Sequence, residues 1–400
     1  MPLLSVDDAK ERILKGVRPL GPEIVPLERA FGRVLARDVK ATRDQPPFEA
    51  SAMDGYAVRH GDVVAIPTML TMIGMSAAGH AYAGRMRPGQ AVRIFTGAPL
   101  PKDADTVVIQ ENTRAEGDKV TILEGARKGQ NVRRRGLDFH KGDVLLRSGT
   151  VLSARDVGLA AAANHPALDV RRRPLVAILA TGDELVLPGS EARADQIFAS
   201  NGYALQGLVQ RFGGTARDLG IVGDDLEATM RAIAKAADAD ILVTTGGASV
   251  GMHDLVQEAL ARSGIELDFW KIAMRPGKPL MFARRRRQRV MGLPGNPVSA
   301  LVCARIFLTP LLCAHLGVST DDEPIEAHLT VPLSANDGRQ DYVRAKLARK
   351  DGAAYEVTPL PKQDSSMQRT YAQAGALIVR APNAPAAAAG DPVPVLILDF

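Results

Sequence analysis

Two kinds of apolar segment alternate between residues 173 and 319, and this alternation constrains the fold more than any other feature of the chain. Short runs such as "LVAILA" and "DILV" have the length of buried strands, and the segments after them have the spacing of amphipathic helices. Strands alternating with helices predict a mostly parallel sheet covered on both faces, in which ligands bind beyond the carboxyl ends of the strands. Strands are predicted near 175–180, 217–222, 241–245, 267–272, 279–283 and 289–293, and helices near 201–212, 225–238, 254–263 and from 297.

The flanking segments predict three further parts. Residues 1–40 are predicted to be helical, and residues 142–172 to add a strand and an alanine-rich helix. Residues 41–141 contain short apolar runs separated by Gly, Pro and Asp, which is typical of an all-β domain inserted into this elongated helical base. The predicted domains are a helical base (1–40 and 142–172), an inserted β domain (41–141), a three-layer α/β domain (173–319) and a C-terminal β domain (320–400).

Hydropathy and cysteine usage predict a cytoplasmic protein without membrane spans. No apolar run approaches the roughly 20 residues that cross a bilayer, and the acidic N-terminal segment "MPLLSVDDAK" is unlike a secretory signal. Cys303 and Cys313 fall in one predicted helix, roughly 15 Å apart, which is too far for a disulfide. Both are predicted to be buried small hydrophobes, which fits a reducing compartment.

The net charge of +5 does not by itself predict nucleic-acid binding. Aromatic residues make up 4% of the chain, and none is interleaved with the basic runs. The run "RRRRQR" at 284–289 lies between two apolar stretches and is predicted to be a solvated hairpin turn.

A glycine-rich turn, "TTGGASVGMHD", joins a predicted strand to a predicted helix and admits three interpretations. A P-loop is excluded, because Met252 and His253 stand where a lysine and a hydroxyl are required. A nucleophile elbow of a serine hydrolase fits "GASVG", with Asp268 and either His315 or His328 as partners. An anion cradle also fits, because glycines let backbone N–H groups approach a phosphate at a helix N-terminus. The cradle residues would be Gly246, Gly247, Ser249 and Gly251.

Carboxylates follow several of the predicted strands. Asp225 and Asp254 also suit helix starts, where a carboxylate is favoured without any other role. A cluster of acids at the ligand-binding edge of a parallel sheet nevertheless suits Mg²⁺, which takes oxygen ligands and bridges to phosphates. The strand-end residues in question are Thr181, Gly182, Asp183, Glu184 and Asp224.

Basic side chains and a rigid loop accompany the acids. The segment "WKIAMRPGKP" carries Lys271, Arg275 and Lys278, which together with a bound cation fit a ligand with anionic phosphates. In "GLPGNPV", Asn296 is predicted to cap a helix, and Pro294 would form a wall of the site.

Six motifs, taken in order, resemble those of the molybdopterin molybdenumtransferase family, which includes the MoeA proteins and the E domain of gephyrin. With the helical start and the β tail, the resemblance covers essentially the whole chain and favours the cradle over the hydrolase. The motifs are "SAMDGYAV", "RIFTGAPLP", "ATGDEL", "TTGGASVG", "RPGKP" and "GLPGNPVSAL".

The resemblance implies an architecture and a reaction. Its parts are an elongated base, an inserted β domain, an α/β domain of the molybdopterin-binding type and a C-terminal β-barrel. It implies a homodimer with the active cleft between subunits, and partners among other molybdenum-cofactor biosynthesis proteins. Molybdate and adenylylated molybdopterin would be substrates, Mg²⁺ would assist, and AMP would be released in the last step of cofactor biosynthesis. Tungstate has the same shape and charge as molybdate, so a tungsten-inserting homologue is an alternative, as is a scaffold protein that kept the fold.

The resemblance also implies roles for single residues. The acids Glu184, Asp224 and Asp254 would hold the metal, while the basic residues of "WKIAMRPGKP" would hold phosphate or molybdate. Arg275 stands where some members have lysine, and its planar fork differs from an ammonium. The inserted and C-terminal domains would add Asp54, Thr96, Arg344 and Ser365, with Ser366 close to the last. Asp54 also has a structural interpretation, as part of a turn in which Gly55 adopts a positive φ.

Overall fold

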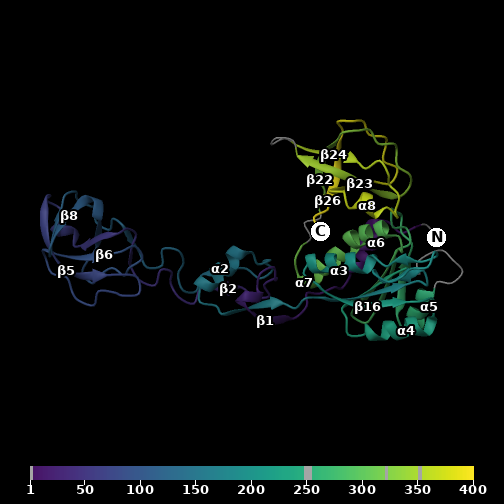
Figure 1. Cartoon of the computed structure of the whole chain (residues 1–400), viewed down its shortest axis with the longest axis horizontal. Coiled ribbons are helices and arrows are strands. Elements are labelled where there is room, and N and C mark those ends of the chain that lie inside the picture. Colours follow the sequence, from purple (N-terminus) through teal and green to yellow (C-terminus); the bar gives the residue numbers. More distant parts are fainter. Residues whose placement is uncertain (1–2, 247–254, 320–322, 350–353) are drawn as a thin grey trace. The chain divides into compact units, whose positions relative to one another are not determined.

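The computed structural model describes residues 3–246, 255–319, 323–349 and 354–400. Its chain forms two compact units (Figure 1). The first consists of Met1–Glu23, Gly32–Ala36 and Val170–Phe400, and the second of Ile24–Phe31 and Arg37–Asp169. The strands β1 (Pro22–Pro26) and β12 (Ala167–Arg171) lie where the chain passes from one unit to the other.

The first unit contains the predicted α/β domain, built on a sheet of order β16-β13-β17-β21-β20-β18. The first four of these strands are parallel neighbours, β20 runs antiparallel beside them, and β18 at the edge runs antiparallel to β20 and so in the same direction as the first four. The strands are β13 (Leu175–Thr181), β16 (Thr215–Val222), β17 (Ile241–Thr245), β18 (Glu266–Trp270), β20 (Met281–Arg285) and β21 (Gln288–Leu293). The predicted three-layer fold is therefore confirmed.

Helices cover both faces of this sheet because its strands are apolar on both sides. Along β13, Val176 and Ile178 face one core, while Ala177 and Leu179 face the other. Figure 1 shows α3 (Asn201–Arg211), α6 (Pro297–Cys303) and α7 (Thr309–Leu316) on one side, and α4 (Leu226–Lys235) and α5 (Leu255–Arg262) on the other. Asp225 caps α4 by accepting the N–H of Ala228 at 2.5 Å, as predicted.

The stretch 297–316 corrects the expectation that no apolar run approaches the length needed to cross a bilayer. It is one helical run of 20 residues, α6 and α7 joined by a π-helical turn at Ala304–Leu308, and it is apolar enough to cross a membrane. In this structure 89% of its apolar 18-residue window is buried, so it is a core helix. Cys303 and Cys313 are both buried in it, as predicted, and burial raises the pKa of the Cys303 thiol.

The N-terminal segment is only partly helical. Ser5 caps α1 (Val6–Leu14), whose buried face packs into the α/β core, but residues 22–40 contain β1 and β2 (Val39–Lys40). The prediction of helix throughout 1–40 is therefore wrong: these strands depend on pairing with distant segments, which local propensity does not reveal.

The run of arginines at 284–287 forms the predicted hairpin, with Arg285 opposite Gln288 and Arg286 at a φ of +54°. Its end is not solvated, however. Arg289 is buried and donates to the Lys15 carbonyl at 2.8 Å, just beyond the last turn of α1.

The second unit holds the inserted β domain and α2 (Ala154–Ala162), which begins with a capping box formed by Ser153 and Asp156. A six-stranded sheet of order β7-β4-β6-β5-β9-β8 has buried residues on both faces. Its strands are β4 (Gly55–Val58), β5 (Thr68–Ser76), β6 (Gln90–Ile94), β7 (Thr106–Ile109), β8 (Thr113–Glu116) and β9 (Lys119–Ile122). Two strand pairs complete it: β2 with β11 (Val144–Leu146), and β3 (Ala50–Ser51) with β10 (Val132–Arg133).

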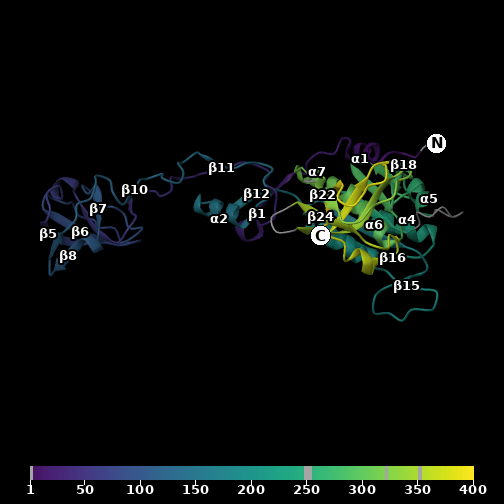
Figure 2. The ribbon, with the colours of Figure 1, turned by 90° about the horizontal axis from the view of Figure 1, so that it is seen from above.

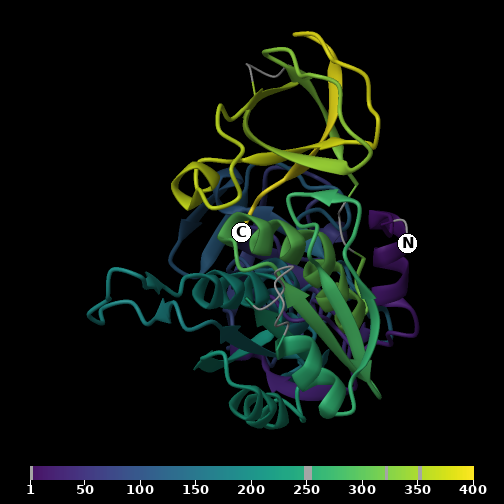
Figure 3. The same ribbon diagram turned by 90° about the vertical axis from the view of Figure 1, so that its right-hand side faces the viewer.

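The C-terminal domain of the first unit is a closed five-stranded barrel, as predicted. The order is β23-β24-β22-β26-β25, and β25 pairs again with β23. Figure 3 shows this domain in yellow and yellow-green. The strands are β22 (Ile325–Leu329), β23 (Gln340–Arg349), β24 (Tyr355–Pro359), β25 (Ala376–Arg380) and β26 (Pro392–Ile397), and α8 (Gln368–Tyr371) precedes β25. One strand outside the barrel, β19 (Met274–Arg275), adds to β23.

Candidate functional site

The register of the α/β sheet brings several strand ends to one edge. Thr181 pairs with Val222 on one side, and Thr245 pairs with Leu293, so the parallel strands end together. Because β18 runs in the same direction as these strands, the residue after it, Lys271, lies at the same edge. Because β20 runs the opposite way, the segment before it, with Lys278, reaches that edge too. We call this set the charged edge; its residues are 181–184, 223–224, 246, 271, 278 and 294–296.

The acids of the charged edge are held by the backbone beside them. Asp183 Oδ1 accepts the N–H of Asp224 at 2.9 Å, which ties the ends of β13 and β16 together. The Glu184 carboxylate lies so close over Gly182 that a Cβ there would overlap it. Asp183, Glu184 and Asp224 are all exposed, so their oxygens can accept ligands.

Behind the acids the edge is closely packed. Thr181 is buried and donates weakly to the Thr245 carbonyl at 3.4 Å, so it forms the floor. A Cβ on Gly246, whose φ is +93°, would overlap the Thr181 carbonyl, so only glycine fits there. Pro294 is buried at the end of β21. The other predicted cradle residues, Gly247, Ser249 and Gly251, lie outside the described residues, as does Asp254.

Among the described residues, no group of three or more His, Cys, Asp or Glu side chains could hold a metal. Two of the three predicted ligands, Glu184 and Asp224, are described and supply exposed carboxylate oxygens at the charged edge. Mg²⁺ keeps several waters and is commonly bound by one or two carboxylates plus substrate phosphates. The side chains present therefore fit Mg²⁺ in that mode.

Arg275 lies in β19, which pairs with β23 of the C-terminal barrel, and its guanidinium group bonds to carboxylates. Its Nε and one terminal nitrogen donate to Asp341 at 3.0 and 2.5 Å, and Asp337 lies 3.4 Å from the other. The hydrogen bonds to Asp341 raise the pKa of Arg275. Asp337, bonded to Arg339, has its pKa lowered to about 2. The arginine fork thus ties β19 to the barrel.

Ser365 and Asn296 join the charged edge to the barrel domain. Asn296 sits at the N-cap position of α6, but its side chain makes no capping bond, contrary to expectation. Its Nδ2 instead donates to Ser365 Oγ at 2.9 Å, and the Val298 N–H donates to the Ser365 carbonyl at 3.0 Å. Ser366 bonds to Asp364 instead, so Ser365 is the serine that meets the charged edge.

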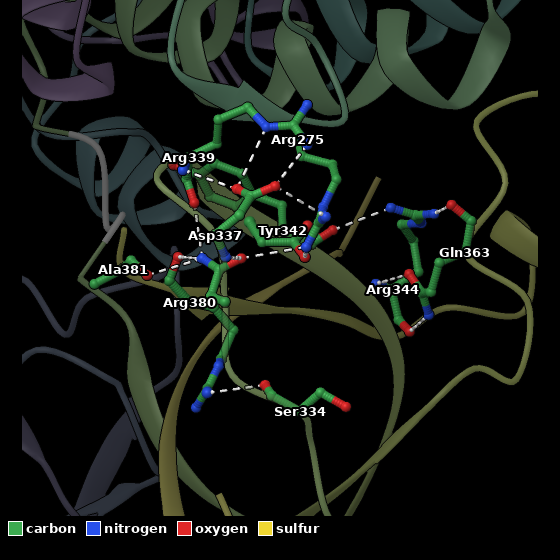
Figure 4. A network of polar contacts seen from close by, with 11 residues as sticks. Arg275, Ser334, Asp337, Arg339, Tyr342, Arg344, Gln363, Arg380 and Ala381 are labelled. Atoms are coloured by element: carbon green, nitrogen blue, oxygen red, sulfur yellow. Dashed lines mark hydrogen bonds and ion pairs between the residues drawn. The ribbon is translucent and has the colours of Figure 1, made fainter. Parts of the chain in front are cut away.

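A cavity of about 360 Å³ opens between β19 and the barrel, and buried arginines line it (Figure 4). Arg344 is 3% exposed and donates to the carbonyls of Tyr342 and Gln363. Arg380 is 8% exposed and donates to those of Ser334 and Pro385. Among the described residues neither forms an ion pair with a carboxylate, and burial lowers the pKa of Arg344. The lining of the cavity contains three arginines, Arg275, Arg344 and Arg380, and one carboxylate, Asp341, so the cavity suits an anion.

In the second unit, Asp54 and Thr96 form one cluster. The Thr96 N–H and hydroxyl both donate to Asp54 Oδ1, at 2.7 and 2.8 Å, and these bonds, the N–H first, lower the pKa of Asp54. Gly55 does not adopt a positive φ, so that expectation is wrong. It is required because a Cβ would overlap the Val108 carbonyl of the neighbouring strand.

Comparisons with known proteins agree with this architecture. The chain matches the MoeA N-terminal region (domain I and II) at residues 4–164, a probable molybdopterin binding domain at 177–314 and the MoeA C-terminal region (domain IV) at 326–398. A molybdopterin molybdenumtransferase of Nostoc sp. is 39% identical over 365 residues, covering 88% of this chain and 84% of that protein. The chain belongs to the molybdopterin molybdenumtransferase family.

Other members of the family match nearly the full length. The Haemophilus influenzae molybdopterin molybdenumtransferase is 34% identical, covering 94% of each chain. The crystal structure of a molybdopterin biosynthesis MoeA protein from Pyrococcus horikosii superposes with a TM-score of 0.86 at 30% identity, covering 99% of both chains. The curated relatives carry the name of a transferase of molybdenum cofactor biosynthesis, so the chain is a transferase of that family.

Family membership leaves the hydrolase interpretation without support, and the described residues give it none. Asp268 forms ion pairs with Arg12 and Arg284, at 3.2 and 3.1 Å. His315 is buried in α7, and the His328 ring bonds to the Gly390 carbonyl. The proposed triad partners therefore have structural roles.

Sequence reasoning missed two residues that the structure places beside the predicted ones: Arg380 lines the cavity with Arg344, and Asn296 bonds to Ser365. Arg380 lies in the apolar strand "ALIVR", and a lone arginine ending such a strand was the one available signal. Asn296 was taken for a helix cap, because its position before Pro297 explained it locally.

Proposed function

We propose that this protein inserts molybdenum from molybdate into adenylylated molybdopterin and releases AMP, the last step of molybdenum cofactor biosynthesis. The observation that carries the proposal is the charged edge, where Glu184 and Asp224 share one end of the sheet with Lys271 and Lys278. Acids and ammonium groups at one edge suit a phosphorylated ligand with its cation. The protein's contribution is to position the substrates and to neutralise charge.

The direct test is to incubate the purified protein with adenylylated molybdopterin, molybdate and Mg²⁺, and to measure AMP and metal-loaded cofactor. We expect AMP and loaded cofactor to form in equal amounts and only when molybdate is present. A parallel series with tungstate separates the two metals, because the oxyanions have the same shape and charge. AMP formation that ignores both oxyanions would contradict the proposal.

Glu184, Asp224 and Asp254 are the residues that would hold Mg²⁺, which when bound neutralises charge on the substrate's pyrophosphate. Chelating divalent cations with EDTA is expected to stop AMP release, and excess Mg²⁺ to restore it. Calcium-loaded protein serves as the control, since Ca²⁺ prefers more ligands and a larger site. If AMP release is unchanged in EDTA, the reaction does not need a divalent cation and the proposed Mg²⁺ site is wrong.

The arginine cavity of the barrel would receive the oxyanion. Replacing Arg344 with Met is expected to raise the apparent KM for molybdate about tenfold, because one charge-assisted contact contributes about 1.5–3 kcal/mol. The variant Lys346→Met is the matched control: it removes a cation from the same strand, but Lys346 is exposed and does not line the cavity. Equal effects of the two variants would mean that general charge, and not the cavity, attracts molybdate.

The active assembly that we propose is a cytoplasmic homodimer in which Asp54 and Thr96 of one subunit complete the partner's cleft. The two hydrogen bonds from Thr96 support a role for Asp54 as a fixed, ionised carboxylate. Sedimentation of the purified protein tests the dimer. Mixing an Asp54→Asn variant with a Glu184→Gln variant tests the shared cleft, because mixed dimers would regain activity in one of their two clefts.

A further inference from the structure

Trp270 and Lys271 are consecutive residues, yet their side chains meet. The Nζ of Lys271 lies 3.7 Å from the centroid of the Trp270 ring. Successive residues of a strand point to opposite faces, and Trp270 is the last residue of β18. Lys271 departs from this alternation because its φ is +72°, a left-handed conformation that is uncommon for a residue with a side chain. The turn at Lys271 folds its side chain back over the indole.

The backbone around this turn is fixed. The N–H of Lys271 donates to the Leu280 carbonyl, and the N–H of Ile272 donates to the Lys278 carbonyl, both at 3.0 Å. A strained backbone of this kind persists only where the surrounding structure determines it, and such positions cluster at functional sites. The two lysines of the charged edge are therefore linked through one small loop.

The ring itself is also anchored. Trp270 lies opposite Met281 in the β18–β20 ladder and packs against the core beneath α4 and α5. Its buried Nε1 makes no hydrogen bond among the described residues, so packing holds the ring. An indole face attracts an ammonium group through its quadrupole, and the N–H donors that point away from the ring stay free. Those donors can still bind an anion while the ring holds the ammonium.

We propose that Trp270 is a positioning residue that holds the Lys271 ammonium ready for a tetrahedral oxyanion. That oxyanion is either free molybdate or the phosphate of the adenylylated substrate. The inference rests on the proposed function, which makes the charged edge the binding site. Without the ring, the ammonium on its flexible stem would spread over many positions near the exposed carboxylates of the same edge.

Trp270 is the only tryptophan in the chain, so its fluorescence reports on this contact directly. Titrating the intact protein with molybdate, and separately with AMP, is expected to give a saturable change in tryptophan emission in at least one series. The anion that produces the change in emission is the one that Lys271 binds. Sodium chloride at matched ionic strength is the control. In Lys271→Gln the change is expected to disappear. A change that persists in Lys271→Gln, or no change with either anion, would overturn the inference.

Kinetics separate positioning from simple packing. Trp270→Leu keeps an apolar side chain but loses the ring face, and is expected to raise the KM for the oxyanion about two- to fivefold with little change in kcat. Trp270→Phe keeps an aromatic face and is expected to restore the parent KM. If Phe and Leu behave alike, the ring acts only as packing. If the parent protein releases no AMP, the proposed function fails, while the fluorescence titrations still decide whether Lys271 on its ring binds oxyanions.

Discussion

Replacing Glu184 with Gln is expected to lower the rate of AMP release about 100-fold or more, because one preorganised charge at a reacting phosphate typically contributes a factor of that size. Glutamine keeps the shape of the side chain and removes the negative charge. The Glu184 carboxylate is exposed at the end of β13 and lies over Gly182, so the substitution leaves no buried group unpaired. The fold is therefore expected to survive. The measurement is the rate of AMP release by the variant compared with that of the parent protein.

Glu191→Gln is the matched control for this variant. Glu191 is an exposed glutamate on the arm between β14 (Leu185–Val186) and β15 (Ile197–Phe198), which Figure 2 shows standing away from the body of the α/β domain. Both variants change the net charge by the same amount. If Glu184→Gln retains activity close to that of Glu191→Gln, Glu184 is not a metal-site residue and the proposed role of the charged edge is wrong.

Much of the α/β domain could be predicted from the sequence, because its strands are buried on both faces. The run that became β17 was predicted at its observed bounds, Ile241–Thr245, and β13 was one residue longer than expected. Parallel strands ending in polar residues also predict a shared edge, so Glu184 and Asp224 could be assigned together before their register was known. Local sequence patterns predict the strands and their shared edge because both follow from which residues are buried.

Contacts between distant segments could not be predicted. Arg275 was assigned to substrate, but the structure gives its fork to Asp341, 66 residues later in the sequence. Arg380 faces a cavity that forms only when β25 closes the barrel against β23. Trp270 was given no role, although it begins the basic motif "WKIAMRPGKP". Its contact with Lys271 depends on the positive φ of Lys271, which the sequence does not show. In each case the partner depends on register or on a backbone angle that composition does not encode.

Gly55 shows how such a contact can decide stability, and Gly55→Ala is expected to destabilise the inserted domain by about 3 kcal/mol or more. Gly55 lies in the central strand β4, opposite both Ile94 and Ile109. An added Cβ would overlap the Val108 carbonyl and lie 2.9 Å from the Cα of Ile109. Both neighbours are backbone atoms of a paired strand, so neither can move without breaking the ladder.

The measurement is thermal unfolding of the full chain, with hydrogen exchange to identify which domain melts. For a domain of roughly 100 residues, such a loss lowers the unfolding midpoint by about 10–20 °C. The control is Gly61→Ala in the same domain, where an added Cβ meets nothing within 4 Å and φ is not positive. It is expected to leave the midpoint nearly unchanged. If the two variants melt together, the close approach of β4 and β7 does not require glycine at position 55.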